Sequence, residues 1–89
     1  MIRRDVVLTN RLGLHARAAS KLVQTASNHN CQVWLERGER RVNAKSIMGV
    51  LLLAAPVGSE LVLETDGAEE EAAMIALVDL IEDRFGEGE

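Results

Sequence analysis

The sequence predicts an α+β domain with two layers, in which helices cover one face of a four-stranded sheet. Apolar residues alternate with polar ones in four segments, as in strands, and recur at spacings of three and four in three others, as in helices. These segments follow one another in the order β-α-β-β-α-β-α. The chain of 89 residues fits one domain, 1–89, without an internal repeat or linker.

The first half of the chain predicts two strands that flank a helix, followed by a hairpin partner. Residues 2–9 alternate and are rich in β-branched side chains, which predicts a strand. Residues 16–27 predict a helix. After a turn-rich break, residues 31–36 predict a second strand, which a Gly-containing turn joins to a short third strand at 40–43. The expected core face of the helix is Ala19, Leu22, Val23 and Ala26.

The second half predicts two helices with a strand between them. Ser46 is a favourable N-cap for a short apolar helix at 47–54, in front of Pro56. Residues 60–66 alternate as a fourth strand. The last helix, 68–84, has acidic residues in its first turn, where they oppose the positive end of the helix dipole. Its expected core face is Met74, Leu77, Val78, Ile81 and Phe85.

Composition excludes several classes of function. A formal net charge of −4 disfavours nucleic acid as the partner. No apolar run approaches the roughly 20 residues that span a bilayer, and residues 1–5 do not resemble a secretory signal. The single cysteine, Cys31, suits a reducing compartment. The histidines and the cysteine lack metal-ligand spacing. We therefore expect a cytoplasmic monomer without a metal, a cofactor or a membrane partner.

The first candidate site is the start of the helix at 16–27. None of the residues just before it is a favoured cap, so the backbone N–H groups of Ala16, Arg17 and Ala18 are expected to lack partners. Such amides form an anion site at the positive end of the helix dipole, and the Arg17 side chain adds a charge suited to phosphate. His15 stands at this site with an imidazole that can act as a nucleophile. A surface histidine without chemistry remains the alternative.

The second candidate site is the helix at 47–54. Ser46 is explained first as an ordinary N-cap, and a regulatory role is compatible with it, because a phosphate there would lie where the helix dipole tolerates its charge. The helix is also more apolar than one buried stripe requires. With Val50, Leu53 and Ala54 facing inward, an exposed apolar patch for partner docking is expected, and a buried or self-associating helix is the alternative. The patch residues are Ile47, Met48 and Leu51.

Two segments resemble a known family. Residues 10–17, Asn-Arg-Leu-Gly-Leu-His-Ala-Arg, resemble the active-site segment of HPr, the histidine phosphocarrier of the bacterial phosphotransferase system. Residues 42–50, Val-Asn-Ala-Lys-Ser-Ile-Met-Gly-Val, look like the regulatory-serine segment of that family. The predicted order of elements matches over essentially the whole chain. The resemblance implies an open-faced β-sandwich with antiparallel strand order 1-4-2-3.

The resemblance also implies a function. His15 would accept a phosphoryl group on Nδ1 from enzyme I, with help from Arg17, and pass it to IIA-type proteins, so the protein would be a carrier and not a self-contained enzyme. Ser46 matches the position that HPr kinase/phosphorylase modifies. The patch of Ile47, Met48 and Leu51 corresponds to the partner-docking surface of the family.

One residue departs from the family pattern. Ala18 stands where the family usually has Pro, so an additional N–H is present in the first helical turn. This difference hints at a divergent branch, such as a nitrogen-related phosphotransferase system, and leaves the sugar and nitrogen branches open. A regulatory binding module that uses the apolar patch without obligate phosphotransfer is the alternative function.

Overall fold

The computed structural model describes residues 1–87 and has the predicted order of elements. The elements are β1 (Ile2–Val7), α1 (Ala16–Ser27), β2 (Gln32–Arg37), β3 (Arg40–Asn43), α2 (Ile47–Leu52), β4 (Glu60–Asp66), α3 (Glu70–Glu82) and a final 3₁₀ turn, η1 (Arg84–Gly86).

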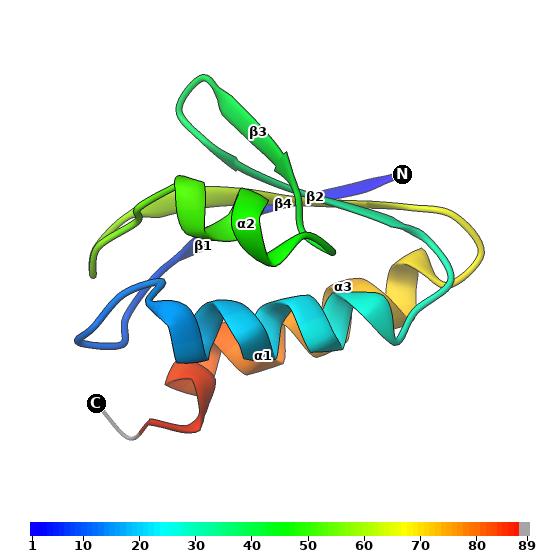
Figure 1. Ribbon diagram of the computed structural model, residues 1–89. Coiled ribbons are helices and arrows are strands. Elements are labelled where there is room, and N and C mark those ends of the chain that lie inside the picture. The colour runs from blue at the N-terminus through cyan, green and yellow to red at the C-terminus, as the bar shows by residue number, and fades with distance from the viewer. Residues whose placement is uncertain (88–89) are drawn as a thin grey trace.

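The four strands form one antiparallel sheet in the order β1-β4-β2-β3. β4 therefore lies between β1 and β2, with Val6 opposite Leu61 and Leu35 opposite Leu63. The three helices lie on the same side of this sheet, and the other face is open (Figure 1). The predicted open-faced α+β sandwich and its strand order are confirmed.

The core lies between the sheet and the helices and is almost entirely aliphatic. Every second side chain of the central strands points into it, and α1 and α3 supply the opposing faces. Its largest fully buried members include Leu22, Val33, Leu35, Leu61, Leu63, Leu77 and Ile81, with Phe85 as the aromatic exception. Because these positions are the ones at strand and helix spacing, the expected core faces are confirmed, apart from the partly exposed Val23 and Val78.

Three strand and helix ends differ from the sequence prediction. β1 ends at Val7, because Leu8 pairs with the loop around Ser59 instead of with β4. β2 begins at Gln32, so Cys31 precedes the strand. α2 ends at Leu52, and Ala54 adopts a left-handed φ of 48° that no helix can continue. Ala54 is consequently exposed and not inward-facing as expected.

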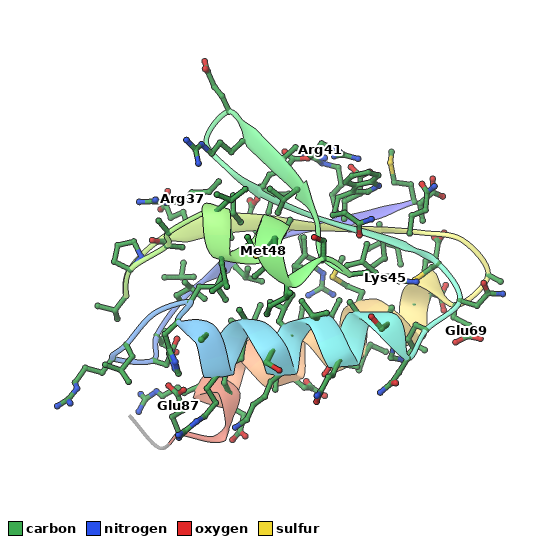
Figure 2. The ribbon with its side chains drawn as sticks, in the orientation of Figure 1. Arg37, Arg41, Lys45, Met48, Glu69 and Glu87 are labelled. Carbon is green, nitrogen blue, oxygen red and sulfur yellow. The ribbon has the colours of Figure 1, made fainter. Side chains whose placement is uncertain are left out.

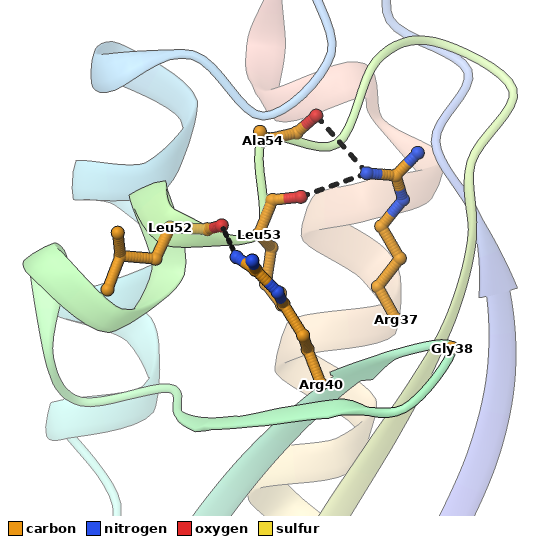
Figure 3. Close-up of a pocket in the computed structure, with 6 residues that line it drawn as sticks. All are labelled: Arg37, Gly38, Arg40, Leu52, Leu53 and Ala54. Atoms are coloured by element: carbon orange, nitrogen blue, oxygen red, sulfur yellow. Dashed lines mark hydrogen bonds between the residues drawn. The ribbon is translucent and has the colours of Figure 1, made fainter.

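Two arginines explain where α2 ends. The Arg40 guanidinium donates to the Leu52 carbonyl at 2.8 Å, and Arg37 donates to the carbonyls of Leu53 and Ala54 at 3.0 and 3.4 Å (Figure 3). These carbonyls belong to the carboxyl end of the helix, which lacks intrahelical donors and carries partial negative charge. The β2–β3 hairpin therefore caps α2 from outside.

The end of the chain also differs from the expected long helix at 68–84. α3 ends at Glu82, and Arg84, Phe85 and Gly86 follow with φ values of 53°, 55° and 73°. Left-handed backbone is unfavourable for the two non-glycine residues, and complete burial of Phe85 offsets this cost. The resulting turn brings the end of the described chain back to the amino end of α1 (Figure 1).

The open face of the sheet carries a network of ion pairs. Arg3 and Arg41 each contact both Glu36 and Glu64, and the closest contact to Glu64 from Arg41 is 2.8 Å. The Arg41 guanidinium also lies 4.6 Å from the centroid of the Trp34 ring, close enough for a cation–π interaction (Figure 2).

None of the helices within residues 1–87 has the length and apolar character needed to cross a membrane.

Candidate functional site

His15 is itself the N-cap of α1. Its backbone is extended, with φ −78° and ψ 178°, and its Nδ1 accepts a hydrogen bond from the Arg17 amide at 3.3 Å. The prediction that the Arg17 amide lacks a partner was therefore wrong, because an imidazole nitrogen fills the role that a Ser or Asp oxygen usually fills. The bond is long for an N–H donor, so this cap holds the amide weakly.

The remaining first-turn amides behave as the sequence predicts. Within residues 1–87, no protein acceptor lies within hydrogen-bonding distance of the N–H groups of Ala16 and Ala18. Over the same residues, no carboxylate pairs with the Arg17 side chain. The Arg17 guanidinium at the amino end of α1 thus keeps a full positive charge with which no carboxylate of residues 1–87 pairs.

The loop before α1 is fixed by its backbone. The Leu14 amide donates to the Ala55 carbonyl at 2.8 Å, and the Asn10 side chain donates to the Gly13 carbonyl at 2.7 Å. Gly13 has a φ of 65°, and a Cβ there would lie 2.5 Å from the Ala55 oxygen. Only glycine fits this close approach, so Gly13 sets the position of His15 against the segment that follows α2.

The sequence reasoning missed Glu87, which contacts His15. One oxygen of the Glu87 carboxylate contacts His15 Nε2, and the other accepts from the Asn10 side-chain amide at 3.0 Å. Glu87 lies beside the amino end of α1 in Figure 2. Its side chain is 13% exposed, and that of His15 is 26% exposed. Burial raises the pKa of Glu87, but hydrogen bonds from Asn10 and His15 outweigh it and leave that pKa below its usual value.

A hollow of about 330 Å³ adjoins this cluster. Its lining residues are Arg11, Leu12, Arg17, Lys21, Gly86 and Glu87. Three of these are basic and one, Glu87, is acidic, so the lining has a net positive charge that suits an anion. Within residues 1–87 no group of three or more His, Cys, Asp or Glu side chains is placed to hold a metal ion.

The second candidate site has the predicted N-cap. The Ser46 hydroxyl accepts from the Gly49 amide at 3.2 Å, so its structural role is clear. Ile47, Met48 and Leu51 are 38%, 66% and 36% exposed, and Leu52, at 60%, extends the apolar patch beyond the residues expected. α2 packs against α1, and the Leu14–Ala55 hydrogen bond joins the loop of His15 to the segment after α2.

Comparison with known proteins places the chain in a class of phosphocarriers. A family profile described as the PTS HPr component phosphorylation site matches residues 2–83. Phosphocarrier protein HPr of Cupriavidus necator is 57% identical over 89 residues, all of both chains. Those of Neisseria meningitidis and Pseudomonas aeruginosa are 53% identical over all of both chains and 50% identical over 96% of each.

Solved structures agree. A crystal structure of HPr from Thermoanaerobacter tengcongensis is 47% identical, covers 98% of each chain and superposes with a TM-score of 0.95. The chain therefore belongs to the HPr family, the phosphocarrier proteins of the phosphotransferase system. Another structure from the same organism is described as an HPr dimer, with a TM-score of 0.79, so the expected monomer stays a prediction.

Proposed function

We propose that this protein accepts a phosphoryl group on His15 Nδ1 from phospho-enzyme I and passes it to IIA-type proteins. The observation that carries the proposal is the position of Nδ1 at the opening turn of α1, where it lies 3.3 Å from the Arg17 amide. Amides that point at developing charge stabilise it without a covalent bond, so the group stays transferable.

The weak cap has a chemical use in this proposal. Nδ1 must release the Arg17 amide when its lone pair attacks phosphorus, and the released N–H then faces the incoming phosphoryl oxygens. The Arg17 guanidinium adds a charge that no carboxylate of residues 1–87 neutralises. Ala18 has an N–H that a proline would lack, but the residue is fully buried, so the exposed first-turn donors are the amides of Ala16 and Arg17.

The direct test is uptake of label from phosphoenolpyruvate through enzyme I, compared between the wild type and His15→Ala. We expect acid-labile, base-stable label on the wild type and none on the variant. His29→Ala is the matched control, because His29 lies at the far end of α1 and bonds the Thr25 carbonyl. Equal labelling of wild type and His15→Ala would contradict the proposal.

We further propose that partners dock on the patch of Ile47, Met48 and Leu51. The charge pattern supports this, because residues 6–35 and 40–59, which include α1 and α2, contain no Asp or Glu. Most of the acidic residues lie instead in residues 60–89 of the sequence. A partner with an apolar centre and acidic rim would match this surface in both respects.

A charge placed in the patch tests the docking surface. Met48→Glu is expected to weaken enzyme I and IIA binding by at least tenfold, because it puts a carboxylate into an apolar contact. Ile75→Glu is the control, since Ile75 is equally exposed, at 64%, but lies on α3. Similar binding losses in both variants would exclude a specific patch. If His15→Ala still binds a partner through the patch and still changes the activity of that partner without phosphotransfer, the regulatory-module alternative is favoured.

We also propose that phosphorylation of Ser46, by a kinase of the HPr kinase/phosphorylase type, controls this docking. A phosphate there adds negative charge beside the patch while α2 tolerates it at its amino end. Ser46→Asp should slow label uptake at His15 with little change in stability. Ser46→Ala, which removes the cap without adding charge, should leave uptake near the wild-type rate. Equal rates in Ser46→Asp and the wild type would contradict charge repulsion.

A further inference from the structure

The carboxylate of Glu87 sits on the ring nitrogen of His15 that the transfer itself does not use. It contacts Nε2, while Nδ1 faces the first turn of α1. We propose that Glu87 is a positioning residue that keeps the proton of His15 on Nε2 and stabilises the positive charge that the ring gains when Nδ1 bonds phosphorus. This inference rests on the proposed role of His15.

Glu87 is held in place on several sides. Asn10, which is fully buried, donates to the second carboxylate oxygen at 3.0 Å and to the Gly13 carbonyl at 2.7 Å. One amide group therefore ties Glu87 to the loop that carries His15. Lys21 donates to the Phe85 carbonyl at 2.5 Å, which fixes the last turn onto α1. A carboxylate restrained in this way can orient a ring, unlike one on a freely rotating surface side chain.

The hydrogen bonds determine the tautomer. An ionised carboxylate can only accept, and the pKa of Glu87 below its usual value keeps it ionised, so a proton must stand on Nε2. The Arg17 amide can only donate, so Nδ1 must present its lone pair. Two independent contacts thus specify the same neutral form of the ring, with the nucleophilic nitrogen toward the helix start.

The charge balance of the transfer explains why a carboxylate is useful there. The Nδ1 lone pair forms the new N–P bond as the bond between phosphorus and the donor group of enzyme I breaks, and the electron pair of that bond returns to the donor. The His15 ring, still protonated on Nε2, becomes positively charged. Glu87 stabilises that charge in the manner of the aspartate in a Ser-His-Asp triad, without taking the proton.

Two variants separate charge from contact. Glu87→Gln keeps an oxygen that can accept from Nε2 but removes the charge, and Glu87→Ala removes both. Glu82→Gln, on an exposed residue near the end of α3, makes the same charge change away from His15 and is the matched control. In single-turnover transfer from phospho-enzyme I, we expect Glu87→Gln to lower the maximal rate roughly tenfold and the half-saturating concentration to change less than about twofold.

A spectroscopic readout is independent of transfer. In ¹H–¹⁵N spectra of the neutral ring, the wild type and Glu82→Gln should show a protonated Nε2 and an unprotonated Nδ1, and Glu87→Ala should show a larger share of the other tautomer. A wild-type maximal rate in Glu87→Gln, or a tautomer ratio unchanged in Glu87→Ala, would overturn the inference. If His15→Ala still takes up label, the proposed function fails instead, and the spectra still report whether Glu87 sets the tautomer.

Discussion

Two regions of this protein use arginine in opposite ways: the open face of the sheet and the amino end of α1. On the open face, Arg3 and Arg41 are tied to Glu36 and Glu64 in a closed network of pairs. At the amino end of α1, Arg17 pairs with no carboxylate of residues 1–87, and two helix amides have no acceptor there.

The difference teaches where binding capacity is kept. A charge already paired in the folded protein has little left to offer a partner, whereas an unpaired cation beside bare amides can gain a new contact at full strength. The ion pairs of the open face therefore stabilise the fold, whereas the charge of Arg17 at the helix start can bind a transient anion. Substitutions on the two faces should accordingly affect different measurements.

The largest expected effect is on phosphoryl transfer at the helix start. Arg17→Ala should slow label uptake at His15 by about 10²- to 10³-fold, as when one donor to a developing oxyanion is removed. Urea unfolding should be nearly unchanged, because Arg17 has no ion pair to lose within residues 1–87. Arg41→Ala is the control and should do the reverse, lowering stability while keeping the rate. A similar loss of rate in both variants would break the comparison.

The loop that presents His15 gives the next effect. Gly13→Ala should lower the free energy of unfolding by about 2–4 kcal/mol, since its Cβ would meet backbone atoms of Ala55 and Pro56 at 2.5 and 2.8 Å in a left-handed conformation. Gly38→Ala is the matched control, with φ 59° and no atom within 4 Å, and should lose only about 1–2 kcal/mol. Urea titration at a constant m-value measures both. Equal losses would show that loop packing does not hold the site.

Local pattern was enough to predict most of this fold. The bounds of α1, β3 and β4 agree with the sequence expectation to the residue, because apolar spacing and the flanking turn residues mark both of their ends. Ser46 was recognisable as an N-cap because its role depends on a neighbour three residues away. The exposed patch on α2 followed from a surplus of apolar side chains over one buried stripe.

Contacts between distant segments could not be predicted in the same way. Glu87 lies 72 positions from His15, and only the left-handed turn at Arg84 and Phe85 brings it there. Neither Arg nor Phe is a residue type that indicates a left-handed backbone. The apolar periodicity therefore predicted a helix that continues to residue 84, past the end of α3. His15 as a cap was missed for a different reason, since imidazole is a rare acceptor at this position. The signal that was available is the acidic residue just beyond Gly86.

A moderate effect is expected from acid on the open face. Hydrogen bonds from Arg41 and Arg3 lower the pKa of Glu64 to about 2 from 4.5. A carboxylate whose pKa is lower in the folded protein than in the unfolded chain stabilises the fold at a pH above the unfolded-chain pKa. This contribution is lost as the pH falls from about 4.5 toward 2. Wild-type stability should therefore drop in that window, and Glu64→Gln should show a shallower drop. Glu39→Gln, in the exposed β2–β3 turn, should follow the wild type. If stability falls with pH in the same way in the wild type and both variants, the ion pairs of the open face do not contribute to stability.

The smallest effect is expected at the N-cap of α2. Ser46→Ala should lower the free energy of unfolding by about 1 kcal/mol, because the Gly49 amide loses its acceptor in a helix of six residues. Ser46→Asp should retain that stability, since aspartate caps equally well and its charge opposes the helix dipole. Thermal and urea unfolding of the two variants measure the difference. If alanine proves as stable as serine, the Ser46 cap contributes no measurable stability to the fold, and the position would be free to serve regulation alone.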